Sequence, residues 1–405
     1  MMDSSAGETR AAGETRDAGA ARAGGLTRRE ALRTMARTPV GLSVLGALGG
    51  VSAMSMSSCE ADSPSAAEKR VVLYSSADDE ILRTIVGQFE KAARVKVAVV
   101  TDTEATKTTG LVLRLLDERS APRADVWWSS EPLGTVRLAR DGVLGSVPET
   151  LISAGWPTSL VGADRAWVGF ARRARVIAFS TKRVAAGERP GRLRELIEPR
   201  WKGRIGMARP QFGTTRTQMA ALLAAAGDRA MRGWLRGLSA NEVRLYDGNA
   251  SVVRAIAQGE IDVGLTDSDD AWAAKRNGWA VESVFESRDD VIEVDEMKVD
   301  GNRVEDRLKI EGELASNGPL LMPNTVSVVR GGPNGAGGLK LVEFLLSAGV
   351  ERALAASDSR NIPVSSSVAS EFEALRVPTA WEPDWEQVAG ASDEAMKICG
   401  EMLKG

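Results

Sequence analysis

The residues best suited to chemistry stand in one short stretch, GEIDVGLTDSDDAW, which spans positions 259–272. Its alternating apolar first half predicts a buried strand, and its last residues predict the start of a helix. Asp267, Ser268, Asp269 and Asp270 lie between the two. Ligands of open α/β sheets bind beyond the carboxyl ends of the strands, so this acidic turn is a candidate binding site. A helix cap would explain one of these side chains, but not three acids.

Polar side chains gather at the ends of other predicted strands too. They are Ser75, Ser76, Asp78, Asp79, Ser129, Ser130, Glu131, Thr214 and Thr215. The two threonines open a predicted helix, where free backbone N–H groups and the helix dipole favour an anion; an ordinary threonine cap is the alternative. Arg175 adds a positive charge within the long predicted strand 167–180, and the partial alternation of that strand predicts one exposed face.

The composition excludes several kinds of site. The 405 residues include no histidine and two cysteines, and the formal net charge is -3. Ser-His-Asp catalysis, imidazole zinc sites and thiolate clusters therefore cannot be built, and a bound metal would need oxygen ligands, which hard cations prefer. Without a basic block, nucleic acid is not expected as a partner.

The N-terminus has the pattern of an export signal. Arg28 and Arg29 precede a mildly apolar run rich in Gly, Ala and Ser, which is typical of a twin-arginine signal over residues 1–58. Cys59 follows Met-Ser-Ser and resembles the lipidated cysteine of bacterial lipoproteins; cleavage near Ala53 is the alternative. Residues 59–69 then predict a polar tether.

The rest of the chain alternates strands with helices, including one helix predicted over 339–356. This order indicates an α/β protein, and the length allows two domains. Polar loops at several strand ends resemble the walls of a ligand cleft more than a catalytic site.

Several segments, in this order, resemble the periplasmic solute-binding proteins of bacterial ABC importers, in their ferric-iron-binding branch. The segments are VVLYSSADDE, ADVWWSSEPLGTVRLARDGVL, RARVIAFSTKRV, EPRWKGRIGMARP, GNASVVRAIAQGEIDVGLTDSDDA and LLMPNTVSVV. The resemblance implies a two-lobed, type II periplasmic-binding-protein fold with mixed sheets, helices on both faces and a hinge that closes on ligand. It places 70–172 and 326–364 in lobe one, and 173–325 and 365–405 in lobe two.

The resemblance also exposes a departure from the family. Ferric-binding relatives carry adjacent iron-binding tyrosines after the strand that here ends near Leu265, whereas this chain has Thr266 and the acidic turn. Tyr74 and Tyr246 are its only tyrosines. A tyrosinate iron site of the usual kind is therefore not expected.

The function implied is that of the substrate-binding component of an ABC importer, a monomer without enzyme activity or a resident cofactor. The cargo would be iron or another hard ion held by Glu131, Asp267, Asp269 and Asp270, with Asp78 or Asp79 from the facing lobe and a synergistic anion at Thr214 and Thr215. A cationic or zwitterionic solute such as an aminophosphonate is the alternative, with Arg175 or the helix end at Thr214 and Thr215 taking its anionic group. A carboxylate-based hydrolase and a purely structural lipoprotein are remote alternatives. The expected partners are permease and ATPase subunits, and the expected location is the cell envelope, through a lipid anchor only.

Overall fold

The computed structural model describes residues 70–102, 108–289, 314–377 and 379–403. All of these belong to one unit, Ser63–Gly405. The predicted signal, the tether and Cys59 lie outside the described residues. No helix within the described ranges is long and apolar enough to cross a membrane.

The first sheet is built around β1, which lies between two parallel neighbours, β2 and β3. The long strand β10 continues this sheet antiparallel to β3, and β4 pairs with the end of β10. Its strands are β1 (Val71–Ser75), β2 (Val97–Thr101), β3 (Val126–Ser129), β4 (Leu144–Gly145) and β10 (Leu321–Val329). The helices of this part are α1 (Asp79–Ala93), α2 (Thr109–Asp117), α3 (Pro132–Arg140), α7 (Gly335–Leu345) and α8 (Ala348–Ala356).

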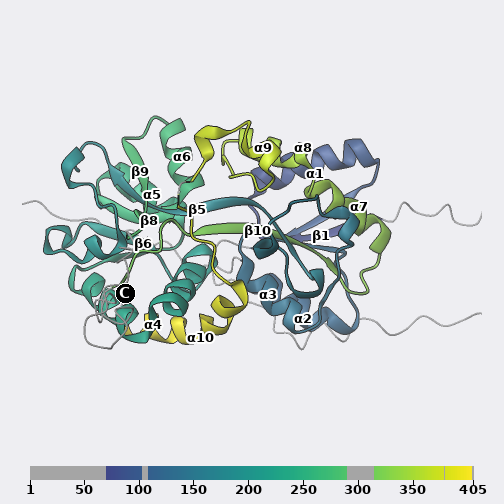
Figure 1. Ribbon diagram of the computed structural model, residues 1–405, viewed down its shortest axis with the longest axis horizontal. Helices are drawn as coiled ribbons and strands as arrows, with labels where there is room; N and C mark the ends of the chain where they lie inside the picture. Colours follow the sequence, from purple (N-terminus) through teal and green to yellow (C-terminus); the bar gives the residue numbers. More distant parts are fainter. Residues whose placement is uncertain (1–69, 103–107, 290–313, 378, 404–405) are drawn as a thin grey trace, which may run out of the picture. The chain divides into compact units, whose positions relative to one another are not determined.

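The strand β5 (Val168–Ser180) belongs to both sheets. Its first half pairs with β10 and its second half with β8 and β9, all antiparallel. Figure 1 shows β5 and β10 side by side where the two sheets meet. The second sheet adds β6 (Ile205–Ala208), β7 (Arg244–Tyr246), β8 (Val263–Asp267) and β9 (Val281–Phe285). Its helices are α4 (Gly213–Ala240), α5 (Asn249–Gln258) and α6 (Ser268–Arg276).

The C-terminal segment returns to the second sheet. After the short helix α9 (Ser366–Ala369), α10 (Trp385–Met402) packs mainly on α4, and it also contacts α3 (Figure 1). Trp385 and Ile398 of α10 share one buried apolar cluster with Met219 of α4 and Ile205 of β6. The exact limits of the two lobes remain a prediction.

Two details of the predicted elements are wrong. The single helix expected over 339–356 is two helices, because Ser347 accepts a hydrogen bond from the Val350 N–H at 3.3 Å and starts α8 anew. The apolar spacing runs on through this break, so periodicity could not reveal it. The expected exposed face of β5 is also absent: apart from Arg172, all of its residues are buried. Alternate residues of β5 pack into different buried apolar clusters, Ile177 and Phe179 into one and Val176 and Ala178 into two others, and carboxylates neutralise Arg173 and Arg175.

Glu286, just after β9, makes stability depend on pH. Burial raises the pKa of its carboxyl from 4.5 to about 7, although Ser316 and the Leu193 N–H oppose the shift. The folded protein thus binds more protons than the unfolded chain between these values, and stability falls as pH rises through this window. We expect Glu286→Gln to raise the free energy of unfolding by about 1–3 kcal/mol at pH 8 and to change it little at pH 4.5.

Urea unfolding at both pH values measures this effect. Glu282→Gln, which alters an exposed carboxyl on β9, is the matched control and should change stability by less than about 0.5 kcal/mol at either pH. An equal effect of Glu286→Gln at both pH values would contradict the assignment.

Candidate functional site

The acidic turn forms the junction between β8 and α6. Asp267 ends the strand and occupies the N-cap position of the helix, yet its side chain makes no capping hydrogen bond. Ser268, Asp269 and Asp270 form the first helical turn. One oxygen atom from each of the three carboxylates lies within 4.8 Å of the others. The helix brings the acids together, and capping does not account for Asp267.

Asp267 is held by a buried network. Its carboxylate accepts from Arg175 Nη1 at 2.8 Å, Thr214 Oγ1 at 2.6 Å and Asn249 Nδ2 at 3.0 Å. Arg175 also donates to the amide oxygen of Gln218 at 2.9 Å. The side chains of Arg175 and Asp267 are only 2% and 5% exposed, so this is a fully desolvated ion pair. The network fixes the end of β8 to the first turn of α4.

Arg173, two residues earlier on β5, bridges two walls of the site. Its Nη1 donates to Asp269 at 3.0 Å, and its Nη2 donates to the Ser130 carbonyl oxygen at 2.6 Å. Its Nε lies 3.8 Å from an Asp267 oxygen. Burial disfavours the charge on Arg173, but the carboxylates of Asp269, Asp267 and Asp78 outweigh burial and raise the pKa of the guanidinium.

The other two carboxylates of the acidic turn, those of Asp269 and Asp270, have raised pKa values. Burial is the main cause that raises the pKa of Asp269, and Asp267 and Asp78 raise it further against the effect of Arg173. Burial is also the main cause that holds the pKa of Asp270 well above its usual value, and the carboxylates of Asp269, Asp267 and Asp78 raise it further. A cation placed among these groups would favour their ionised forms.

A cavity of about 210 Å³ opens over this cluster. Asp78, at the start of α1, and Ser130, after β3, line it opposite the turn and Thr214. The predicted site residues that line it are Asp78, Ser130, Thr214, Thr215, Asp267, Asp269 and Asp270. The sequence therefore places residues from four separate segments around one cavity.

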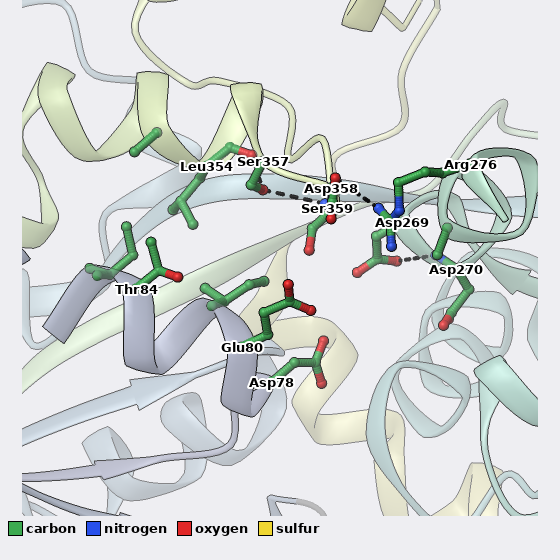
Figure 2. A pocket seen from close by; sticks show the side chains of 14 residues that line it. Asp78, Glu80, Thr84, Asp269, Asp270, Arg276, Leu354, Ser357, Asp358 and Ser359 are labelled. Carbon is green, nitrogen blue, oxygen red and sulfur yellow. Dashed lines mark hydrogen bonds and ion pairs between the residues drawn. The ribbon is translucent and has the colours of Figure 1, made fainter. Parts of the chain in front are cut away.

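A second cavity, of about 200 Å³, adjoins the first and shares Asp78, Asp269 and Asp270 with it. Figure 2 shows Asp78 and Glu80 on one wall of this second cavity, facing Asp269 and Asp270 across the space. Arg276 of α6 and Asp358, beyond α8, form an ion pair of 3.0 Å at its rim. The acids of the turn thus face both cavities.

The other predicted site residues line neither of these two cavities. Glu131 caps α3, accepting from the Leu133 and Gly134 N–H groups, and it also accepts from Thr217 Oγ1 at 3.0 Å. Burial raises the pKa of its carboxyl, and it is not a member of the three-carboxylate group. Asp79 is exposed. Ser75, Ser76, Ser129, Arg175 and Ser268 are buried and line neither cavity.

The structure adds lining residues that the pattern did not indicate. Arg173 was visible only as one charge in a strand predicted to have an exposed face. Asn249, the first residue of α5, reaches the cavity and bonds to Asp267. Its position after Gly248, in a polar run before an apolar helix, was the available signal. Glu80 of α1 and Arg276 of α6 line the second cavity, and no sequence pattern indicated that either residue belongs to a site.

Comparison with known proteins shows which family this chain belongs to. The family model described as bacterial extracellular solute-binding protein matches residues 71–357. The chain belongs to this family. Members of the family are binding proteins, so the predicted binding role is favoured over the hydrolase alternative. The two-lobed type II fold predicted from the sequence is confirmed by structural neighbours of this class.

Three relatives illustrate the similarity. Iron uptake protein A1 of Synechocystis is 25% identical over 76% of this chain and 81% of its own length. The major ferric iron-binding protein of Neisseria meningitidis is 27% identical over 48% of this chain and 57% of its own length. The apo ferric ion-binding protein A of Pasteurella haemolytica has a TM-score of 0.68 at 20% identity, over 82% of this chain and 97% of that structure.

Proposed function

We propose that this protein is the extracytoplasmic substrate-binding component of an ABC importer and that its cargo is ferric iron or a similarly hard metal ion. The names of its relatives, which describe iron uptake and ferric iron binding, support this proposal. The permease and ATPase would be separate chains. The ion would sit in the cavity above the acidic turn, with an anion near Thr214 and Thr215.

The observation that carries the proposal is the position of the carboxylates. Asp269 and Asp270, with Asp267, come within 4.8 Å of one another, and Asp78 faces them across the cavity. Hard cations prefer carboxylate oxygens. Because burial and mutual repulsion already raise the pKa values of Asp269 and Asp270, a cation would relieve a repulsion that is built into the site.

The ligand set would differ from a tyrosinate site. Tyr74 donates to Glu118 at 3.0 Å, and burial raises the pKa of its phenol to about 12. The hydroxyl group of Tyr246 donates a hydrogen bond to the Glu260 carboxylate at 3.3 Å. Neither tyrosine lines the two cavities beside the acidic turn. We therefore assign the direct contacts to Asp78, Asp269 and Asp270, and a supporting role to Asp267.

Metal analysis and mass spectrometry of natively purified protein test the proposal. We expect about one equivalent of iron or another hard metal, and saturable binding of ferric ion supplied from a weak chelator. A stoichiometric organic cation or zwitterion in place of metal, together with no ferric binding, would reject the metal assignment and favour the aminophosphonate-type alternative.

The anchor and the domain limits form part of the same proposal. Residues 1–58 would direct export and Cys59 would carry lipid, which leaves the two lobes, divided near 172, 326 and 364, outside the membrane. We expect Cys59→Ser to move the exported protein from the membrane fraction to the soluble fraction. Fractionation of cells with immunodetection measures this, and membrane retention of the variant would contradict lipidation at Cys59.

A further inference from the structure

Arg173 is a resident cation in the cavity where the cargo ion is proposed to bind. It lines the cavity, whereas Arg175 does not. Its guanidinium joins Ser130 on one wall to Asp269 on the other. Its buried Nε has no hydrogen-bond acceptor, although the Asp267 carboxylate is 3.8 Å away. The guanidinium is therefore attracted by two acids without being fully satisfied by either.

A metal ion and Arg173 would need the same carboxylate. Asp269 uses one oxygen for Arg173 and the other for the Asp270 N–H, at 3.1 Å. Each carboxylate oxygen has two lone pairs, so a metal could ligate Asp269 beside these contacts, but it would share the carboxylate charge with Arg173 and weaken the attraction between them. It must also approach a fixed positive charge in a buried place, where Coulomb repulsion is screened far less than in water. Both effects oppose cation binding.

We propose that Arg173 is the specificity-determining residue of the cleft: it competes with the cargo ion for Asp269, and thereby lowers affinity and speeds release. This inference rests on the proposed metal function. Asp267 does not need Arg173, because Arg175, Thr214 and Asn249 satisfy its carboxylate. The charge of Arg173 is therefore available to act on the ligand, and it distinguishes a strongly charged ion, which can displace it, from a weakly charged ion, which cannot.

Neutral replacements of Arg173 in the full chain test this role. Arg173→Met removes both charge and donors, and Arg173→Gln removes the charge but keeps an amide that can bond to Ser130 or Asp269 if the Met variant does not fold. Arg173→Lys retains the charge. Arg172→Gln is the matched control, because Arg172 is adjacent on β5 but bonds to Glu382 and to the Pro363 carbonyl oxygen, away from the cavity.

The probes are terbium(III) chloride, a hard trivalent ion, followed by calorimetry and tryptophan-sensitised luminescence, and ferric ion from a weak chelator. We expect the Met and Gln variants to bind terbium at least 10-fold more tightly than the native protein and to release it more slowly. Arg173→Lys and Arg172→Gln should stay within about 3-fold of the native protein. A purely structural role for Arg173 would not increase affinity.

The outcomes separate this inference from the proposed function. If the native protein binds ferric ion but the neutral variants bind neither metal more tightly, Arg173 is not a competitor and the inference is overturned, while the metal function stands. If only the neutral variants bind metal, Arg173 excludes metal ions from the native cavity, the native cargo is not a metal ion, and both the metal function and the proposed competition with a cargo ion are overturned. If no form binds metal, both are overturned.

Discussion

Replacing Asp267 by alanine is expected to lower the free energy of unfolding by about 3–5 kcal/mol, because removal of one partner leaves a buried charge without its counter-ion. The remaining partner is Arg175, whose side chain is 2% exposed. Arg175 already has one buried donor, Nη2, without an acceptor. Thr214 and Asn249 would lose their common acceptor as well.

Urea unfolding of the ligand-free protein measures this loss. Asp393→Ala is the matched control: Asp393 pairs with Arg216 at 3.2 Å, a comparable contact, but its side chain is 99% exposed. Exposed pairs contribute about 0–1 kcal/mol, so this variant should be nearly as stable as the native protein. Equal effects of the two substitutions would show that the Asp267 network is not structurally important.

The broad architecture could be predicted because it depends on local patterns. Alternation of strands and helices gave the α/β class, and polar residues after apolar runs marked the ends of β1, β3 and β8. The same local rule brought Asp78, Ser130 and Asp269 to one cavity, since strand ends at one sheet edge are neighbours in space. What periodicity could not show is a capped break between packed helices, as at Ser347.

The partners of the charged residues could not be predicted, because they come from distant segments. Arg173 and Asp269 are 96 positions apart, and no local pattern indicates that they meet. Without that knowledge, an arginine in an alternating strand predicts exposure, and a carboxylate beside a helix predicts a ligand or a cap. The same limit applies to Glu131, whose position before Pro132 was compatible with a helix cap or with a metal ligand.

The three carboxylates of the acidic turn have two different roles. Asp267 has a full set of protein partners, which is expected of a residue that fixes the end of β8. Asp269 and Asp270 have raised pKa values and face both cavities. The turn therefore combines one structural carboxylate with two that can exchange protein contacts for a ligand.

The double variant Asp269→Asn/Asp270→Asn is accordingly expected to fold as the native protein does but to lose metal affinity by roughly 100-fold or more, since even supporting residues of metal sites contribute 10–100-fold. Asparagine retains an oxygen that can accept from Arg173, and it removes two charges that burial already disfavours. Ferric titration, with thermal unfolding as the test of folding, measures both effects. Asp79→Asn, which neutralises an exposed carboxylate beside Asp78, should bind as the native protein does. If the double variant binds ferric ion with native affinity, the acidic turn does not hold the cargo, and the direct ligands must be sought elsewhere in the cleft.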